Sequence, residues 1–179
     1  MTNWQEAVEV ALWDAICSAL GLDAGSDAAA ALIRYADRDD GTDVRPPRTT
    51  DVIYISVSPE QDTGATAWVA SAFDNGEIRT VRTIPLTCLL VCYGPQSSLY
   101  ADALWAGIWA DLGPGSPRDV LRRANLTPVP PLNRPTLAPE PEDGNWRKRA
   151  DLRVRMNLHL ESAAAFVPVA SPPDVSIET

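Results

Sequence analysis

Apolar residues recur every three or four positions at the start of the chain, as they do on one face of a helix. Within residues 4–20 the apolar positions of this face are Trp4, Val8, Ala11, Leu12, Ala15, Ile16 and Leu20. The spacing predicts an amphipathic helix, and Gly21 stands where a C-capping glycine belongs. A second helix is predicted over residues 26–36, with Ser26 or Asp27 as its N-cap.

Four segments between residues 51 and 93 have the apolar or alternating composition of β-strands. They are DVIYISVS (51–58), TAWVASAF (66–73), GEIRTVRTI (76–84) and LTCLLVCY (86–93). Asp74-Asn75-Gly76 predicts a hairpin turn between the second and third segments, and Pro85 is expected to separate the third from the fourth. The fourth is apolar at nearly every position, which is typical of a central strand covered on both faces.

A third helix is predicted over residues 97–112, with a serine at its start as the cap. Only two of its residues are charged, and Tyr100, Trp105 and Trp109 spread its apolar surface beyond one stripe. A helix that is apolar on nearly all sides is buried on more than one side. Either a neighbouring subunit or a proline-rich segment of the same chain would cover the second side, and the sequence leaves both open.

That proline-rich segment, residues 113–141, contains eight of the sixteen prolines. Ser116-Pro117 predicts the N-cap and the first residue of a short helix that runs to Arg123. The rest has neither helical nor strand periodicity, so we expect a proline-rich extended arm over residues 113–145. The sequence does not indicate whether this arm lies on its own subunit or on a neighbouring one.

Strict alternation predicts a last strand, DLRVRMNLHLES (151–162), whose polar face includes Arg153 and Arg155. With Arg147 and Arg149, the segment WRKRADLRVR holds five of the nine basic residues of the second half of the chain. A nucleic-acid patch is one interpretation. We favour an interface strand that pairs with acidic loops of a neighbouring subunit, because the chain as a whole is acidic.

The order of these elements, α-α-β-β-β-β-α-arm-β, predicts a single α+β domain over residues 1–179. We expect a mainly antiparallel sheet of about four to six strands with helices packed on one face, plus the proline-rich arm. The tail sequence DVSIET is a candidate edge strand.

The composition is that of an ordinary globular domain, with 45% hydrophobic and 22% charged residues. The net charge is -9, and residues 1–90 carry 14 acidic against 6 basic residues, which argues against a protein that grips nucleic acid through its phosphates. The sequence indicates neither a signal peptide nor a membrane span. Cys17, Cys88 and Cys92 are too few for a disulfide framework, so we expect reduced, buried thiols in an intracellular compartment.

No catalytic, cofactor-binding or metal site is predicted. The turn CYGPQSS has one glycine and no lysine, so it is neither a phosphate loop nor the G-x-S-x-G turn of a serine nucleophile. His159, the only histidine, is expected to be exposed or hydrogen-bonded on its strand. DRDDGTD (37–43) departs from the spacing of a calcium loop, and Cys88 and Cys92 lie too far apart along a strand for a metal knuckle.

Several features of the chain occur in a fixed order. An N-terminal helix is followed by a proline-bearing loop into DVIYISVS, a hairpin and an apolar strand ending in CYG. The helix SLYADALWAGI follows, and then NWRKRADLRVRMNLHL with a W-x-x-R start at Trp146 and Arg149. This arrangement, over roughly residues 4–177, resembles the neck or tail terminator proteins of tailed bacteriophages.

The resemblance implies a virion structural protein without catalytic residues, assembled in the host cytoplasm as part of the tail or neck. It implies a ring, commonly sixfold, that stops tail-tube growth and docks the filled head. The implied partners are further copies of the chain, the tail tube protein and the head–tail connector or adaptor proteins, with the tail sheath as a further candidate. Genomic DNA would pass through the lumen without specific binding, and no membrane or cofactor is involved.

The candidate subunit-interface residues combine the aromatic helix with the arginine-rich strand. They are Tyr100, Trp105, Trp109, Arg147, Arg149, Arg153 and Arg155. The residues themselves leave an alternative open, namely a monomeric acidic intracellular module that binds a basic protein. An enzyme of unrecognised type is a third interpretation, which the single histidine and the missing phosphate and metal motifs disfavour.

Overall fold

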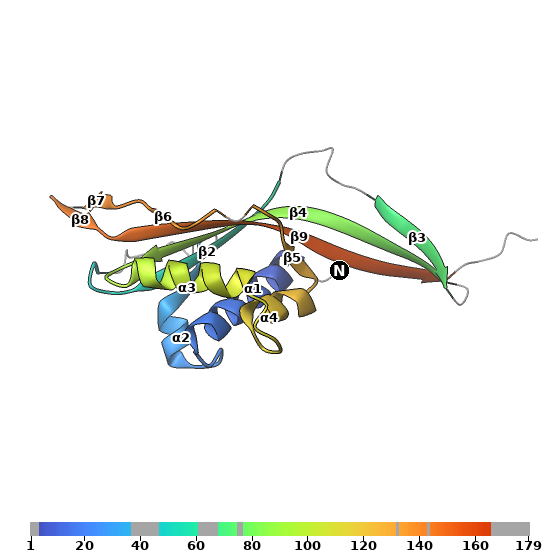
Figure 1. The fold of residues 1–179 in the computed structure, drawn as a ribbon, viewed down its shortest axis with the longest axis horizontal. Helices are drawn as coiled ribbons and strands as arrows, with labels where there is room; N and C mark the ends of the chain where they lie inside the picture. Colours follow the sequence, from blue (N-terminus) through green and yellow to red (C-terminus); the bar gives the residue numbers. More distant parts are fainter. Residues whose placement is uncertain are drawn as a thin grey trace, which may run out of the picture.

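Two long antiparallel strands form the spine of the fold (Figure 1). The computed structural model describes residues 4–36, 47–60, 68–74, 77–131, 133–142 and 144–165. In it β4 (Glu77–Tyr93) and β9 (Arg149–Ala165) pair over their whole length, with Glu77 opposite Ala165 and Tyr93 opposite Arg149. Because cross-strand partners share a face, the alternating apolar residues of both strands point to the same side of the sheet.

Shorter strands extend this pair into a sheet that has seven strands in the described chain. On the outer side of β4 lie β2 (Val52–Pro59), β3 (Trp68–Asp74) and, beyond β2, β1 (Ile33–Tyr35). On the outer side of β9 lie β5 (Leu126–Pro128) and β6 (Thr136–Leu137). A separate two-stranded hairpin consists of β7 (Glu140–Glu142) and β8 (Asn145–Arg147).

Among the described residues every strand pairing is antiparallel except that of β1 with β2. The predicted α+β class with a mainly antiparallel sheet is therefore confirmed. The sheet has more strands in the described chain than the four to six expected, because β1, β5 and β6 were not predicted. Each of these three strands is only two or three residues long. Strands of that length leave no alternation in the sequence that could reveal them.

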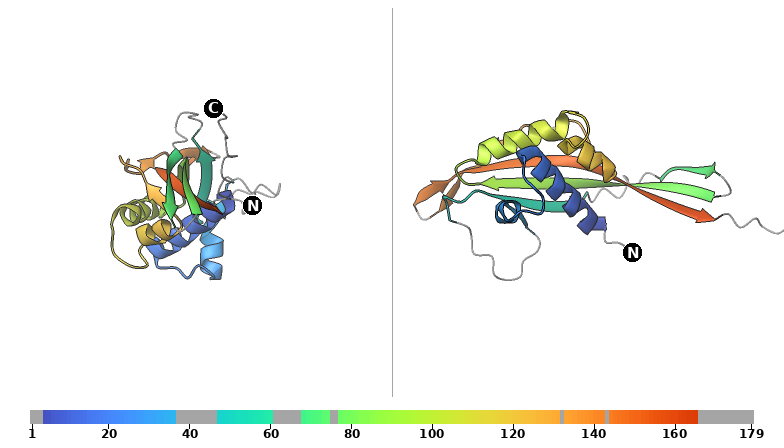
Figure 2. Two further views of the ribbon diagram at one scale, coloured as in Figure 1. Left: turned by 90° about the vertical axis from the view of Figure 1, so that its right-hand side faces the viewer. Right: turned by 90° about the horizontal axis from the view of Figure 1, so that it is seen from below.

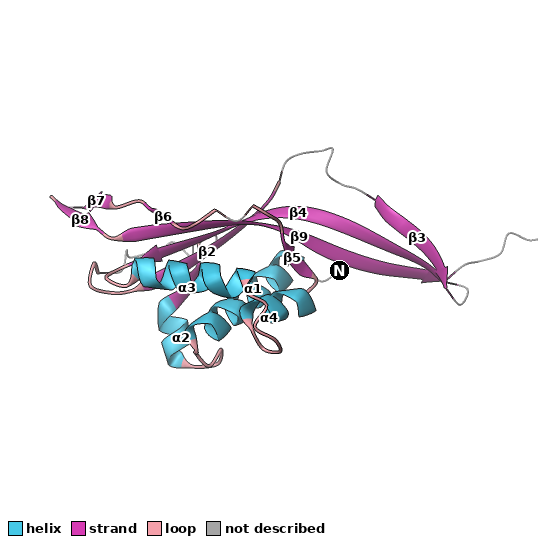
Figure 3. Cartoon of the chain, viewed as in Figure 1, coloured by secondary structure: helices cyan, strands magenta, loops and turns pink. Residues whose placement is uncertain are grey.

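The helices of the described chain all lie on one face of the sheet, as Figures 2 and 3 show. They are α1 (Trp4–Leu20), α2 (Asp27–Leu32), α3 (Ser97–Trp109) and α4 (Pro117–Arg123). The core between the two layers consists of alternate strand residues and one side of each long helix. Its largest fully buried side chains are Leu12, Ile16, Ile33, Ile53, Ile55, Leu86, Leu90, Leu104, Leu121, Leu126, Leu152 and Met156. Removing one such side chain from water contributes ~1.5–3 kcal/mol.

Two helices have the bounds that the sequence predicts. α1 ends at Leu20, and Gly21 follows with a φ of 66°, the left-handed conformation of a C-capping glycine. α4 begins with Pro117 after the N-cap Ser116, whose hydroxyl oxygen accepts a hydrogen bond from the Asp119 N–H at 3.4 Å. Both signals are local in sequence, which is why they could be recognised without the fold.

The other two helices are shorter than predicted. α2 ends at Leu32, and the residues that were assigned to its last turn form β1 instead. Ile33 is buried there and lies opposite Ile53 of β2, because a β-branched side chain packs better in a sheet than in a helix. α3 ends at Trp109, three residues before the predicted end at residue 112.

The serine cap predicted for α3 is wrong. The N-cap residue is Gln96, which makes no side-chain cap hydrogen bond, and Ser97 is buried in the first turn. Asp51, which precedes β2, fulfils the capping role from a distant part of the chain. Its Oδ1 atom accepts a hydrogen bond from the Gln96 N–H at 2.9 Å, and its charge is favourably placed at the helix N-terminus.

Pro85 does not separate two strands, contrary to the prediction, but lies within β4 opposite Asn157. The nitrogen and carbonyl oxygen of a residue in an antiparallel strand point to the same neighbour. The carbonyl of Pro85 accepts a hydrogen bond from the Glu60 N–H at 3.0 Å, so its nitrogen faces the side on which β2 has just ended at Pro59. A proline is tolerated there because the ladder requires no donor from it.

The proline-rich extended arm expected over residues 113–145 is not confirmed. After α4 the segment forms β5 and β6, which pair with β9 of the same chain, and then β7. Leu126 of β5 is buried in the core. The segment therefore lies along its own sheet.

The predicted hairpin is confirmed, since β3 pairs with β4 and Asp74 lies opposite Glu77. Its turn residues Asn75 and Gly76 lie outside the described residues, as do DRDDGTD (37–43) and the tail sequence DVSIET. None of the helices in the described ranges is long and apolar enough to cross a membrane.

Candidate assembly interface

α3 presents the aromatic residues that the sequence marks as interface candidates. Leu104 and Ile108 point into the core and are buried. Tyr100 and Trp105 are partly buried and pack against that core, and Trp109 is half-buried near the end of the helix. Half-buried aromatic side chains keep apolar area that a neighbouring subunit can cover.

The proline-rich segment covers part of this side of α3 within the same chain. The guanidinium of Arg134 lies over the ring of Trp105, 5.4 Å from its centroid, a cation–π arrangement. The indole Nε1 of Trp105 is buried without a hydrogen-bond partner in the described chain. On the first turn of the same helix Leu99 is exposed, so the cover over α3 is incomplete.

The face of the sheet opposite the helices carries three of the four candidate arginines. They alternate along β9 with buried residues, as the sequence predicts, and β4 supplies their neighbours. The cross-strand pairs on this face are Tyr93 with Arg149, Leu89 with Arg153, and Thr87 with Arg155. No helix of the described chain covers this face (Figure 3), which we call the open face.

Arg149 is held by acidic residues of its own chain. Its guanidinium donates two parallel hydrogen bonds to Asp151, of 2.6 and 2.8 Å, and it also pairs with Glu140 of β7. The Tyr93 hydroxyl donates to the same Glu140 carboxylate at 3.2 Å. The hydrogen bonds to Asp151 raise the pKa of Arg149, and the network ties the β7–β8 hairpin to the sheet.

Arg147 is buried, with 3% of its surface exposed. Its guanidinium stacks on the Tyr93 ring at 4.4 Å from the centroid, and that of Arg149 lies 5.6 Å from the same centroid. Among the described residues Nε and Nη2 of Arg147 have no hydrogen-bond partner. The sequence predicts this residue at an interface, whereas the structure places it beneath the surface of its own subunit.

Arg155 and Arg153 differ in what they contact. Arg155 donates to both carboxylate oxygens of Glu60, at 2.7 and 2.8 Å, and the Thr87 hydroxyl donates to Glu60 at 3.2 Å. The hydrogen bond from Arg155 is the main reason that the pKa of Glu60 lies below its ordinary value. Arg153 is exposed between these pairs and forms no ion pair with any described residue.

The histidine and the cysteines could act as nucleophiles or metal ligands, but they are hydrogen-bonded or buried within the fold. His159 Nδ1 lies 3.1 Å from the Thr83 hydroxyl, so it is the hydrogen-bonded strand histidine that was expected. The three cysteines are free and buried, as predicted, and burial raises the pKa of Cys88 and of Cys92 to about 12. No group of three or more potential metal ligands occurs among the described residues.

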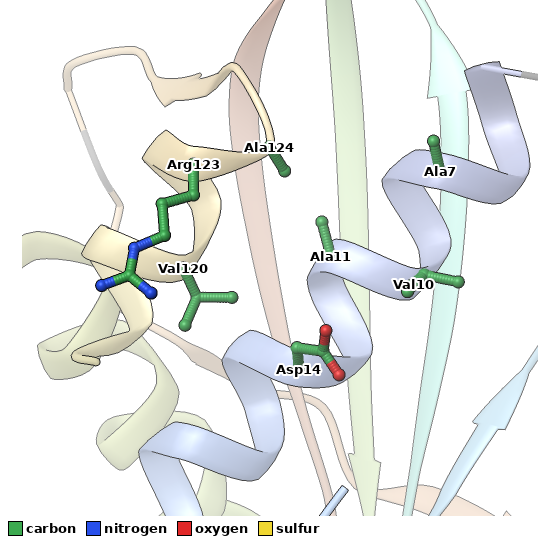
Figure 4. A pocket seen from close by; sticks show the side chains of 7 residues that line it. All are labelled: Ala7, Val10, Ala11, Asp14, Val120, Arg123 and Ala124. Atoms are coloured by element: carbon green, nitrogen blue, oxygen red, sulfur yellow. The ribbon is translucent and has the colours of Figure 1, made fainter. Parts of the chain in front are cut away.

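Two surface features were not predicted. Trp146 on β8 is 70% exposed, and its hairpin extends beyond the helical layer at one end of the molecule (Figure 1). A hollow of about 380 Å³ lies between α1 and α4, with side chains of both helices pointing into it (Figure 4). The residues that line it are Ala7, Val10, Ala11, Asp14, Val120, Arg123 and Ala124.

The family model described as phage neck terminator protein matches residues 6–178, nearly the whole chain. The chain belongs to the phage neck terminator family. This confirms the resemblance drawn from the sequence. Comparison with curated proteins finds no match.

Phage neck terminators are structural proteins, which gives this terminator a place in the tail or neck of the virion. Membership also implies association with other tail and head–tail joining proteins. The arginines that hold β7, β8 and the end of β2 to the sheet therefore stabilise the fold of a structural subunit.

Sequence reasoning missed the hollow between α1 and α4, because it arises only when two helices far apart in the sequence pack together. Trp146 could have been recognised: it is a lone tryptophan between Asn145 and Arg147 in an otherwise polar run. Its position in the W-x-x-R sequence that leads into the last strand supports the family resemblance but does not reveal its exposure.

Proposed function

We propose that this terminator forms a ring that caps the tail tube and joins it to the head connector. The observation that carries the proposal is the family match over residues 6–178. The fold supports it, because a sheet with helices on one face and an open second face offers different surfaces for different contacts. A subunit that must meet its own copies, a tube and a connector needs such distinct surfaces.

A ring requires heterologous contacts, in which two different patches of each subunit meet. We assign one patch to the α3 side, where Tyr100, Trp105 and Trp109 leave apolar area half-buried. We assign a polar contact to Arg153 on the open face, because its guanidinium is exposed and has no described acidic partner. The remaining candidate arginines act indirectly, by fixing the hairpin and the sheet that carry the contacts.

The charge of the chain fits a ring through which DNA passes. With 24 acidic and 15 basic residues the net charge is -9. A lumen lined by an excess of negative charge repels the phosphate backbone, so DNA slides without being held. Specific nucleic-acid binding is not part of the proposed function.

Tail tubes assembled with and without the protein test the proposal. Tubes that lack it are expected to vary in length and to remain without heads, and adding the purified protein should stop growth and restore head attachment. Negative-stain images should show a plug or ring at one tube end, and averaged end-on views should show sixfold symmetry. Tubes of normal length that acquire heads in its absence would contradict the proposal.

A further inference from the structure

Trp146 and the hollow between α1 and α4 lie in different parts of the subunit. The β7–β8 hairpin that carries Trp146 forms one end of the long axis, beyond α3 (Figures 1 and 2). The hollow lies between the N-terminal half of α1 and α4, toward the opposite end of the helical layer (Figures 1 and 4). A hairpin fixed at one end cannot place its tryptophan in the hollow of its own subunit.

We propose that Trp146 of one copy of the chain docks into the α1–α4 hollow of the next copy. This inference rests on the proposed ring, because a side chain protruding at one end of the molecule and a hollow in the helical layer are unlike patches, as a heterologous contact requires. It adds one contact between neighbouring subunits to those proposed for the α3 side and for Arg153. The occupant of the hollow is therefore a second copy of this chain.

Trp146 has the properties of an interface anchor. Its side chain is 70% exposed. An indole has a large apolar area, and burying that area against a partner is favourable. Its cross-strand neighbour Pro141 is also exposed, so the tip presents two adjacent apolar surfaces. Tryptophan is among the residues that most often dominate the binding energy of protein interfaces.

The hollow fits an indole in size and in lining. Its volume of about 380 Å³ leaves room for one indole. Val10, 50% exposed, and Val120 supply apolar walls. Arg123 also lines the hollow; its guanidinium is paired with Asp119 of α4 at 2.6 Å.

Charge also favours this pairing. Lys148, the only lysine of the chain, is exposed two residues after Trp146, and side chains at that spacing on an extended chain share a face. Asp14, exposed on α1, lines the hollow. Docking of the indole would bring Lys148 toward Asp14, which offsets part of the repulsion between two subunits of net charge -9.

The test uses the full chain and keeps Trp146 in place. Asn145→Cys puts a thiol beside the tryptophan, and Ala7→Cys puts one on the rim of the hollow; both positions are exposed. The natural cysteines are buried, so a short thiol cross-linker reports the new thiols. A mixture of the two single variants should give cross-linked dimers, whereas Asn145→Cys mixed with Leu112→Cys, exposed elsewhere, should not.

Two substitutions supply the affinity readout. Trp146→Ser should weaken self-association about tenfold or more, the range of an anchor residue, while the matched control Leu112→Ser should leave it unchanged. Both side chains are more than half exposed, so neither variant should change the thermal unfolding midpoint of the monomer. Equal effects of the two variants on self-association would overturn the proposal.

The failure of the contact and the failure of the proposed function are distinguishable. If capped tubes form with the Asn145→Cys and Ala7→Cys mixture but no cross-linked dimer appears, the docking contact is wrong and the capping function stands. If the unsubstituted protein neither forms rings nor caps tubes, the proposed function is wrong, and the docking contact fails with it. Cross-linked dimers at capped tube ends support both.

Discussion

Gly94 lies so close to Asp51 that a β-carbon on Gly94 would be 2.4 Å from the Oδ1 atom of Asp51. The same β-carbon would be 2.7 Å from the Asp51 Cα and 2.8 Å from the Thr50 carbonyl oxygen. Gly94 also has a φ of 104°, and its N–H donates to the Lys148 carbonyl at 3.2 Å. The glycine of the CYG turn therefore allows the starts of β2, α3 and β9 to meet at one point.

Gly94→Ala should lower the free energy of unfolding by roughly 3 kcal/mol or more. A strained backbone costs ~1–3 kcal/mol, and a contact with backbone atoms that cannot move aside adds a further ~1–3 kcal/mol. Urea denaturation of the purified variant measures the loss. The matched control is Gly113→Ala, where φ is 90° but nothing lies within 4 Å of the added carbon. The control should lose only ~1–2 kcal/mol, and equal losses would contradict the close-contact argument.

Asp51→Ala should remove the cap of α3 and cost ~0.5–2 kcal/mol, the usual range for an N-terminal cap. The hydrogen bond that disappears is the one from the Gln96 N–H to Oδ1 at 2.9 Å. Ser98, exposed in the first turn, provides the comparison, since Ser98→Ala should stay within ~0.5 kcal/mol of the parent. If urea denaturation shows a larger loss for Ser98→Ala than for Asp51→Ala, the helix is capped by a serine and not by Asp51.

Glu60 makes stability depend on acid pH. The pKa of its carboxyl is lowered mainly by the hydrogen bond from Arg155. A lowered pKa in the folded state contributes stability that is present above the unfolded value of about 4.3 and is lost as pH falls through the folded value. The urea midpoint of the parent should therefore fall more steeply below about pH 5 than that of Glu60→Gln. Parallel curves for the two proteins would show that this pair does not contribute.

Much of the architecture could be predicted from the sequence because its signals are local. The three-to-four spacing of α1, the Ser116-Pro117 start of α4 and the strict alternation of β9 are each contained in a short stretch. The segments that were misassigned depend on distant partners. Ile33 leaves its helix because β2 offers it a buried position opposite Ile53, and Pro85 is tolerated because β2 ends beside it.

The interface residues show the same limit. An arginine-rich strand face can be recognised in the sequence, but the partner of each arginine cannot. Glu60 lies 95 positions from Arg155, and only the pairing of β2, β4 and β9 brings them together. The sequence likewise shows Trp105 as apolar surface, without showing that Arg134 covers it.

Arg153→Glu should separate assembly from folding. The guanidinium of Arg153 is exposed, so reversing its charge should change the free energy of unfolding by no more than ~0.5 kcal/mol. If Arg153 pairs with a neighbouring subunit, the variant should cap fewer tail tubes, and high salt should weaken capping by the parent. Arg155→Glu is the contrasting variant, because it places a second carboxylate against Glu60 and should lower the unfolding midpoint as well. Normal capping by Arg153→Glu would remove this residue from the interface.

Trp105→Ser and Trp109→Ser should fail in different ways. Trp105 packs against the core and lies beneath Arg134, so its loss should lower the free energy of unfolding of the monomer by ~1–3 kcal/mol. Trp109 is half-buried one turn later on α3. Its replacement should change monomer stability by less than ~1 kcal/mol but reduce the fraction of capped tubes, because apolar area at the subunit contact is lost. Urea denaturation measures the first effect and counts of capped tube ends the second. A Trp109→Ser variant that caps tubes as well as the parent would exclude this end of α3 from the ring contact.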